Sequence, residues 1–249
     1  MKKKVALVTG GVGGIGTAIC KKLASDGYFV VANYAIDGTE KPWKEKMAAA
    51  GLNGGSSALA FGDVSDYEAM GRMVREIEAQ HGPIDVLVNC AGITRDATFR
   101  KMTPEQWKAV ISTNLDSVFN VTRHVIEGMM ERGWGRVINI SSVNAVRGQF
   151  GQTNYSAAKA GILGFTKALA QEVVKKGVTV NAISPGYVET DMVKAIREDV
   201  RQKIVAEIPA GRLATVDEVA EAVAFLASEK ASYITGTNLN VNGGLHMYG

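Results

Sequence analysis

A tyrosine and a lysine four residues apart form the clearest candidate for chemistry in this sequence. Tyr155 and Lys159 lie in the stretch Tyr-Ser-Ala-Ala-Lys-Ala-Gly-Ile-Leu-Gly-Phe, whose apolar residues recur with a helical period. Residues four apart share one helix face, so the phenol and the ammonium are predicted to lie together. A free tyrosine has a pKa of about 10, and a nearby ammonium favours the phenolate and brings proton transfer closer to neutral pH. The pair alone is also typical of an ordinary surface helix, so the interpretation depends on other motifs.

A hydroxyl precedes this pair at the end of a predicted strand. Residues 136–141 form an apolar run that predicts a buried strand, and Ser142 follows it, thirteen residues before Tyr155. A hydroxyl at the end of a strand can help to hold a substrate carbonyl oxygen.

A glycine-rich segment near the N-terminus predicts a dinucleotide site. A strand is predicted at residues 4–9, glycines fill five of the seven positions from Gly10 to Gly16, and a helical pattern begins at Thr17. Glycines let the backbone approach a pyrophosphate, and a helix N-terminus offers unpaired N–H groups and the positive end of the dipole. Strand, glycine turn and helix in this order favour dinucleotide binding over a plain turn.

The end of the second predicted strand, residues 28–33, is where a dinucleotide fold distinguishes the two nicotinamide cofactors. An acidic residue there favours a free ribose 2′-hydroxyl, and a basic residue favours a 2′-phosphate. Residues 33–35 are neutral, and charges of both signs follow at Asp37, Glu40, Lys41 and Lys44. The residues themselves leave NADPH and NADH open.

Predicted strands and helices alternate along the rest of the chain. Further strands are expected at 57–61, 84–89, 178–184 and 238–242, and helices at 67–81, about 104–131, 154–176 and 216–228. Without any linker-like segment, this alternation predicts one α/β domain over residues 1–249, a Rossmann-type doubly wound parallel sheet of about seven strands. Residues 191–212 are mixed helical and polar, and we expect a lid there.

Side chains at the ends and in the middle of these helices are informative. Asp66 and Thr103 are expected to cap helices, and Thr215 with Glu218 matches a capping box. Asn114 falls inside the long predicted helix, where asparagine is unfavourable by propensity. It is therefore expected to face solvent or to have a polar task.

Composition argues against several classes of protein. The net charge is +3 with scattered basic residues, which does not resemble a nucleic-acid-binding face. No apolar run is long enough for a membrane span, and the start of the chain does not resemble a signal peptide. Two cysteines fit neither a disulfide framework nor a metal site. We expect a cytoplasmic protein with no metal, nucleic-acid or membrane partner.

Taken together and in order, the motifs resemble the short-chain dehydrogenase/reductase family over nearly the whole chain. The usual Asn-Asn-Ala-Gly after the fourth strand is replaced by Asn89-Cys90-Ala91-Gly92, which keeps the small residues that make room for a flat ligand. The matching positions are Thr9-Gly10-x-x-x-Gly14-x-Gly16, Asp63, Asn114, Ser142, Tyr155-x-x-x-Lys159 and Pro185-Gly186.

The resemblance implies hydride transfer from a reduced nicotinamide to a ketone, with a role for each of four residues. Tyr155 would donate the proton, and Ser142 would bind the carbonyl oxygen. Lys159 would lower the tyrosine pKa and hold the nicotinamide ribose, while Asn114 would position a water that passes a proton toward Lys159. NADPH is the implied cofactor, with NADH as the alternative or in dual use. Cofactor contacts are expected at Gly10, Gly14, Ile15, Gly16, Tyr34, Asp63, Val64, Asn89, Ala91, Gly92, Tyr155, Lys159, Pro185, Gly186 and Thr190.

Four longer stretches are similar to the acetoacetyl-CoA reductases of bacterial polyhydroxyalkanoate synthesis, namely residues 92–96, 100–103, 148–155 and 243–247. This similarity implies reduction of acetoacetyl-CoA to (R)-3-hydroxybutyryl-CoA by a homotetramer. The 3-oxoacyl-acyl carrier protein reductases share Gly-Ile-Thr-Arg-Asp at 92–96, so a carrier-protein substrate is the alternative. An inactive cofactor-binding sensor is disfavoured, because all four catalytic positions keep their residue types.

Substrate contacts are predicted around the catalytic tyrosine and the Pro-Gly loop. Lys194 and Arg197 either meet coenzyme A phosphates or lie on a solvated helix face. The predicted acyl and pantetheine contacts are Gln149, Phe150, Gln152 and Tyr187.

Overall fold

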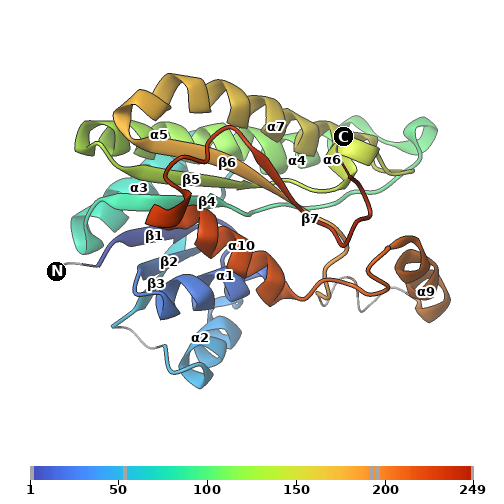
Figure 1. The fold of residues 1–249 in the computed structure, drawn as a ribbon, viewed down its shortest axis with the longest axis horizontal. Helices are drawn as coiled ribbons and strands as arrows, with labels where there is room; N and C mark the ends of the chain where they lie inside the picture. The colour runs from blue at the N-terminus through green and yellow to red at the C-terminus, as the bar shows by residue number, and fades with distance from the viewer. Residues whose placement is uncertain (1–2, 53–54, 191–192, 194–196, 248–249) are drawn as a thin grey trace.

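Seven parallel strands form one sheet in a computed structural model that describes residues 3–52, 55–190, 193 and 197–247. The strand order is β3-β2-β1-β4-β5-β6-β7 (Figure 1). It reverses direction between β1 and β4, which creates a crevice at the carboxyl ends of these strands. The predicted Rossmann-type sheet is confirmed. Its strands are β1 (Val5–Val8), β2 (Phe29–Tyr34), β3 (Ser57–Phe61), β4 (Ile84–Asn89), β5 (Gly135–Ile140), β6 (Val178–Pro185) and β7 (Asn238–Val241).

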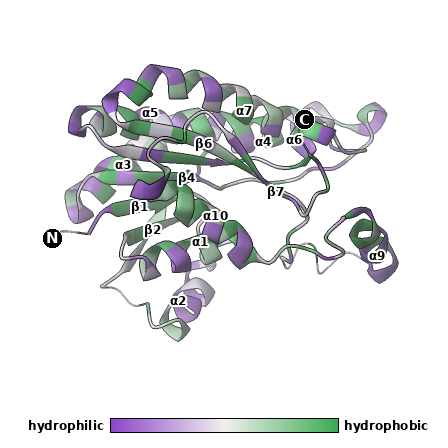
Figure 2. Ribbon diagram, in the orientation of Figure 1, coloured by the Kyte–Doolittle hydropathy of each residue, from purple (hydrophilic) through white to green (hydrophobic). Residues whose placement is uncertain are grey.

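Helices cover both faces of the sheet, and each face has its own apolar core. Figure 2 shows apolar strands in the centre and polar residues on the outer sides of the helices. One face is covered by α1 (Gly14–Ser25), α2 (Glu40–Ala49) and α10 (Val216–Ala227). The other is covered by α3 (Tyr67–His81), α5 (Ser117–Arg132) and α7 (Thr153–Val173), with α4 (Pro104–Ile111) packed on α7.

The three predicted caps are confirmed. Asp66 Oδ1 accepts from the Ala69 N–H at 2.9 Å. Thr103 forms a capping box with Gln106 at the start of α4, and Thr215 forms one with Glu218 at the start of α10. These hydroxyl and carboxylate groups satisfy backbone N–H groups that a helix start leaves unpaired.

Two helical segments of the structure differ from the sequence expectations. The helix expected over 104–131 is interrupted by a π-helical turn at Ser112–Asp116, which separates α4 from α5. Residues 40–49, considered in the sequence only for their charges, form α2, which buries Trp43 and Met47 on one face. Such a π turn inside a helix is common at functional sites, and here it carries Asn114.

The segment expected to form a lid is described only in part. Residues 191–192 and 194–196, which include Lys194, lie outside the described residues. Its later part forms α9 (Glu198–Glu207), which stands away from the sheet in Figure 1. Short helix α6 (Asn144–Arg147) reaches it through an ion pair, with 3.0 Å between Arg147 Nη2 and Glu207 Oε2. In the described ranges, no helix combines the length and apolar character needed to cross a bilayer.

Candidate active site

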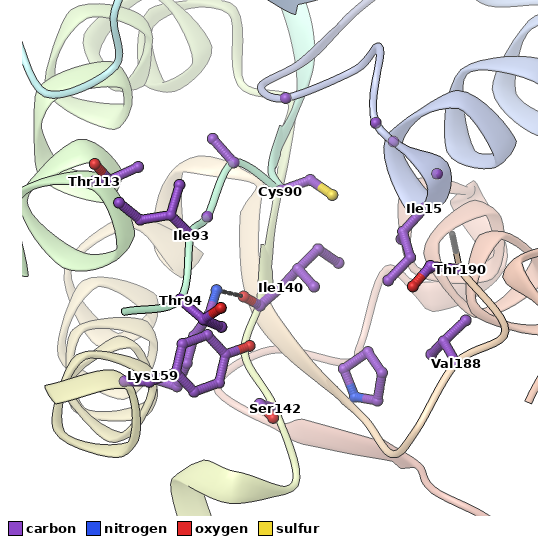
Figure 3. Close-up of a pocket in the computed structure, with 18 of the residues that line it drawn as sticks. Ile15, Cys90, Ile93, Thr94, Thr113, Ile140, Ser142, Lys159, Val188 and Thr190 are labelled. Atoms are coloured by element: carbon purple, nitrogen blue, oxygen red, sulfur yellow. Dashed lines mark hydrogen bonds between the residues drawn. The ribbon is translucent and has the colours of Figure 1, made fainter. Parts of the chain in front are cut away.

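A pocket of about 600 Å³ opens at the carboxyl ends of the strands, beside the reversal in strand order. Its lining comes from the glycine turn and from residues that follow β2, β3, β4, β5 and β6. In Figure 3, Ile15 and Thr190 lie across the pocket from Thr94 and Lys159. A crevice at this place in a doubly wound sheet is where such folds bind their ligands.

Tyr155 and Lys159 lie in one helix, α7, as their spacing predicted, and both line this pocket. Lys159 is only 4% exposed, and its Nζ donates to the Ile140 carbonyl oxygen at 2.8 Å (Figure 3). The same Nζ lies 5.7 Å from the centre of the Tyr155 ring. Ser142, just beyond the end of β5, lines the pocket too. A strand end and a helix therefore bring the hydroxyl, the phenol and the ammonium to one cavity.

Burial controls the protonation of both side chains. Removal from water disfavours an ammonium and lowers the pKa of Lys159 to about 8, with a smaller opposing effect from Cys90. Burial also raises the pKa of Tyr155, while a hydrogen bond with Ser142 acts in the opposite direction. Tyr155 therefore keeps its proton at neutral pH and is able to act as an acid. The expected lowering of the Tyr155 pKa by Lys159 stays a prediction, because the shift of this pKa comes from burial and from other neighbouring groups.

Asn114 fixes the loop that follows β4. Its buried amide accepts from the Ile93 N–H at 2.8 Å and donates to the Ile93 carbonyl oxygen at 2.9 Å. This double contact explains the asparagine in the middle of a helical region. A Cβ added to Gly92 would lie 3.4 Å from Asn114 Oδ1 and 3.5 Å from Lys159 Nζ, so both polar groups border the same small space. The water relay between them stays a prediction.

The glycine turn packs closely against the start of helix α1. A Cβ on Gly16 would lie 2.2 Å from the Gly10 carbonyl oxygen, so any side chain there would displace the turn. Helix α1 begins beside the pocket, and Gly13 at its N-cap gives no side-chain cap to its first N–H groups. Unpaired N–H groups and the positive dipole end then remain available for phosphate. The residues present fit a nicotinamide dinucleotide.

Comparison with known proteins agrees with this geometry. The family profile described as enoyl-(acyl carrier protein) reductase matches residues 11–246. The chain belongs to the short-chain dehydrogenase/reductase family. It is 60% identical to acetoacetyl-CoA reductase of Allochromatium vinosum over 98% of this chain and 99% of the relative. It is 55% identical to acetoacetyl-CoA reductase of Cupriavidus necator, over 99% and 100% of the two chains. It is 45% identical to 3-oxoacyl-(acyl-carrier-protein) reductase of Escherichia coli, over 98% of each.

Membership of the short-chain dehydrogenase/reductase family makes this chain an oxidoreductase with a nicotinamide cofactor. Among the described residues, no group of His, Cys, Asp or Glu side chains is arranged to hold a metal ion. Cys20 and Cys90 are both free thiols, and Cys90 lines the pocket in the position where the family usually has asparagine.

The structure brings all but one of the predicted cofactor residues of this reductase to the pocket lining. Asn89 is the exception, because its side chain donates to Thr122 Oγ1 at 3.1 Å and to Asn139 Oδ1 at 2.8 Å. Asn139 in turn donates to Thr166 of α7 at 2.9 Å. Asn89 thus belongs to a buried polar network that joins β4 and β5 to the helices above them.

The predicted substrate residues divide into two groups. Gln152 and Tyr187 line the pocket, whereas Gln149 and Phe150 do not. Phe150 is 86% exposed, and its loop precedes α7. Arg197, the described member of the two predicted phosphate contacts, pairs with Asp199 at 2.9 Å on an exposed surface.

Two residues to which sequence reasoning assigned no role of their own hold the strand ends together. Thr9 Oγ1 accepts from the N–H groups of Cys90 and Ala91 at 3.0 and 3.1 Å, which ties β1 to β4. Asn33 accepts from the Gly10 N–H at 3.3 Å and donates to the Gly62 carbonyl oxygen at 2.9 Å. Both are polar residues at strand ends, and that position was the signal available in the sequence.

Several lining residues were also missed. Asn144 and Thr94 each lie close behind a predicted strand, where the chain leaves the sheet beside the crevice. The same signal that identified Ser142 therefore applied to them. Other lining residues outside the predicted set include Val12, Ile36, Thr39, Ile93, Thr113, Ile140, Val188 and Val193.

Proposed function

We propose that this reductase uses NADPH to convert acetoacetyl-CoA to (R)-3-hydroxybutyryl-CoA. The observation that carries the proposal is that half-buried Tyr155, with its raised pKa, lines one pocket together with Ser142, Lys159 and the glycine turn. The two acetoacetyl-CoA reductases, at 60% and 55% identity over nearly complete chains, support the choice of substrate.

The protein residues orient the ketone and supply the proton. A bound reduced nicotinamide cofactor would supply the hydride. Ser142 Oγ accepts from the Asn144 N–H at 3.1 Å, so its own hydrogen, which faces Tyr155, can turn to the ketone oxygen when substrate binds. Tyr155 then donates its proton to the oxygen as negative charge develops there. Lys159, held by the Ile140 carbonyl, keeps a positive charge beside the phenol while the proton leaves.

NADPH is preferred because the pocket wall after β2 is uncharged among the described lining residues. Tyr34, Ala35, Ile36 and Thr39 form this wall, and Asp37 is exposed outside it. No lining carboxylate there would repel a 2′-phosphate. Helix α2 begins just beyond Thr39, and Lys41 and Lys44 are exposed on its first turns. The helix N-terminus and the two ammonium groups favour an anion, and they outweigh the opposing carboxylate of Glu40 in the same first turn.

The alternative substrate is a 3-oxoacyl group on acyl carrier protein, as named for the Escherichia coli relative at 45% identity. Coenzyme A is favoured because the two acetoacetyl-CoA reductases are more similar to this chain. Both substrates present the same 3-oxothioester to Tyr155, so the reaction itself does not distinguish them.

The deciding experiment follows the loss of nicotinamide absorbance with acetoacetyl-CoA. Values of kcat/KM are compared for NADPH and NADH, and for acetoacetyl-CoA and acetoacetyl-acyl carrier protein. We expect turnover with coenzyme A and an NADPH preference that falls when Lys41 and Lys44 are replaced together by alanine. Turnover with acetoacetyl-acyl carrier protein but not with acetoacetyl-CoA would contradict the proposed substrate. A preference for NADH would contradict the proposed cofactor.

A second measurement tests the proton donor. Tyr155→Phe should lower the rate of ketone reduction roughly a hundred- to ten-thousand-fold, which is the usual contribution of a positioned acid. Cofactor affinity, measured by titrating NADPH fluorescence, should change little. The variant keeps the aromatic ring, and it keeps Lys159, which is expected to hold the nicotinamide ribose. Undiminished turnover in this variant would show that a group other than Tyr155 supplies the proton.

We also propose that the protein assembles as a homotetramer that pairs the long helices (about 104–131 and 154–176) and the C-terminal strand region. Trp107 of α4 is 38% exposed and Phe119 of α5 is 52% exposed, so large apolar side chains face outward on these helices. Light scattering after size-exclusion chromatography gives the mass directly, and a monomer at micromolar concentration would contradict this assembly.

A further inference from the structure

Asn154, the residue before Tyr155, is fully buried and joins three segments of the chain. It is the second residue of α7, and its exposed fraction is 0%. Its Oδ1 accepts from the Tyr155 N–H at 2.8 Å, and its Nδ2 donates to the carbonyl oxygens of Arg95 at 3.1 Å and Gln106 at 3.4 Å. One amide therefore links the backbone of Tyr155 to the loop after β4 and to α4.

This amide completes the start of α7. The N–H of Tyr155, the third helical residue, has no carbonyl partner within the helix, and the N-cap Gln152 makes no side-chain cap. A backbone N–H only donates and a carbonyl oxygen only accepts, so the group between Tyr155 and Arg95 must do both. Asparagine does so in a single orientation, with its oxygen toward Tyr155 and its NH₂ group toward Arg95.

The loop that Asn154 contacts is itself part of the site. Ile93 lines the pocket, and Asn114 binds both backbone polar groups of Ile93. Two residues further along, the Arg95 carbonyl oxygen accepts from Asn154. Asn114 and Asn154 thus hold one short stretch at both ends, and Tyr155 is placed relative to that stretch.

Lys159, one turn further along α7, is held by a different part of the fold. Its Nζ donates to the Ile140 carbonyl oxygen, and its own carbonyl oxygen accepts from Ser141 Oγ at 2.8 Å. Both contacts come from the end of β5 and the residue that follows it, whereas those of Asn154 come from the loop after β4 and from α4. Loss of the Asn154 amide should therefore displace the phenol of Tyr155 and leave the ammonium in place.

We infer that Asn154 is a positioning residue that sets the Tyr155 hydroxyl for proton transfer to the ketone. A displacement of about 1 Å in a reacting group lowers a rate by up to roughly a hundredfold. A support of this kind affects catalysis without touching the substrate. The inference rests on the proposed function, since it assumes that Tyr155 supplies the proton.

The test is a double-mutant cycle on the reduction of acetoacetyl-CoA by NADPH. Single turnovers with enzyme in excess make the weak residual rate of Tyr155→Phe measurable. Asn154→Leu, which removes the amide at similar volume, should lower the rate roughly ten- to a hundredfold when Tyr155 is present. In the Tyr155→Phe background there is no hydroxyl to place, so the same change should alter the residual rate by less than about twofold.

Affinity for NADPH should stay unchanged in Asn154→Leu, because Lys159 keeps both of its contacts. Asn181→Leu is the matched control, since Asn181 is buried away from the pocket lining and also accepts from one backbone N–H and donates to one carbonyl oxygen. This control should lower stability to urea and leave the rate nearly unchanged in both backgrounds.

An equal loss of rate from Asn154→Leu in both backgrounds, or no loss in either, would overturn the inference. Should the leucine variant fail to fold, Asn154→Ala removes the same polar atoms without adding bulk and is read in the same way. If Tyr155→Phe alone keeps full turnover, the proposed proton donor fails. If Tyr155→Phe loses turnover and the effect of Asn154 is the same in both backgrounds, only the present inference fails.

Discussion

The ammonium of Lys159 lies 5.7 Å from the centre of the Tyr155 ring and donates its hydrogen bond to the Ile140 carbonyl oxygen. The contact with Ile140 fixes the lysine at the carboxyl end of β5, with its charge beside the phenol and not bonded to it. Burial of this pair lowers the pKa of the lysine and raises that of the tyrosine. Both shifts have measurable consequences.

Reduction should decline on the alkaline side, with a midpoint near pH 8. Lys159 is charged below its pKa of about 8 and loses the charge above it, whereas Tyr155, with a raised pKa, remains protonated through this range. The measurement is kcat/KM for the ketone between pH 6 and pH 10. Lys159→Arg, with whatever activity remains, should move the decline to higher pH, and a midpoint that stays near pH 8 would assign it to another group.

The buried Lys159 is expected to lower the free energy of unfolding at neutral pH. Its folded pKa of about 8 lies below the ordinary value of 10.5, so the unfolded chain binds more protons between these two pH values. Stability from this group therefore rises as pH increases through that window. Lys159→Met should unfold at higher urea concentration at pH 7, with a gain of up to about 3 kcal/mol. The gain should shrink by pH 9.5, and a gain independent of pH would refute the linkage.

Asn114→Leu should destabilise the protein and impair reduction together. The leucine leaves the N–H and carbonyl oxygen of Ile93 without their partners, at a cost of about 2 kcal/mol or more. The loop beside Lys159 should shift as a result. Asn181 is a matched control, since it is buried and binds the backbone of Ile234 and Thr237 away from the pocket lining. Asn181→Leu should lose similar stability in urea unfolding and retain kcat, so equal kcat losses would argue against a role for Asn114 at the site.

Gly16→Ala should destabilise the glycine turn itself. The new Cβ would approach the Gly10 carbonyl oxygen to 2.2 Å, and overpacking of this kind costs about 1–3 kcal/mol. Gly13 lies in the same turn with φ of −73°, and its Cβ would be 3.4 Å from the same oxygen. Thermal unfolding without cofactor should therefore separate the two variants, with Gly13→Ala close to wild type. Equal thermal stability of the Gly16→Ala and Gly13→Ala variants would show that the turn can shift to accommodate the new Cβ at little cost.

The alternation of apolar runs and helical patterns determined the fold class, because strand and helix periods are local properties of the chain. Val5–Val8, Ile84–Asn89 and Val178–Pro185 were each predicted to within one or two residues. Helix α2 was not anticipated. Only two of its side chains, Trp43 and Met47, are buried, and their burial depends on packing against the rest of the fold. The π turn at Asn114 likewise depends on a tertiary contact, the pairing of its amide with Ile93.

At the site, the sequence by itself determined which residues share a helix face or follow a strand, as for Tyr155, Lys159 and Ser142. Only the tertiary structure decided what each group faces. It directed Asn89 toward Thr122, left Phe150 exposed and tied Asn154 to the loop after β4. The reason is physical: spacing along a chain is local, whereas burial and hydrogen-bond direction depend on segments brought together from distant parts of the sequence.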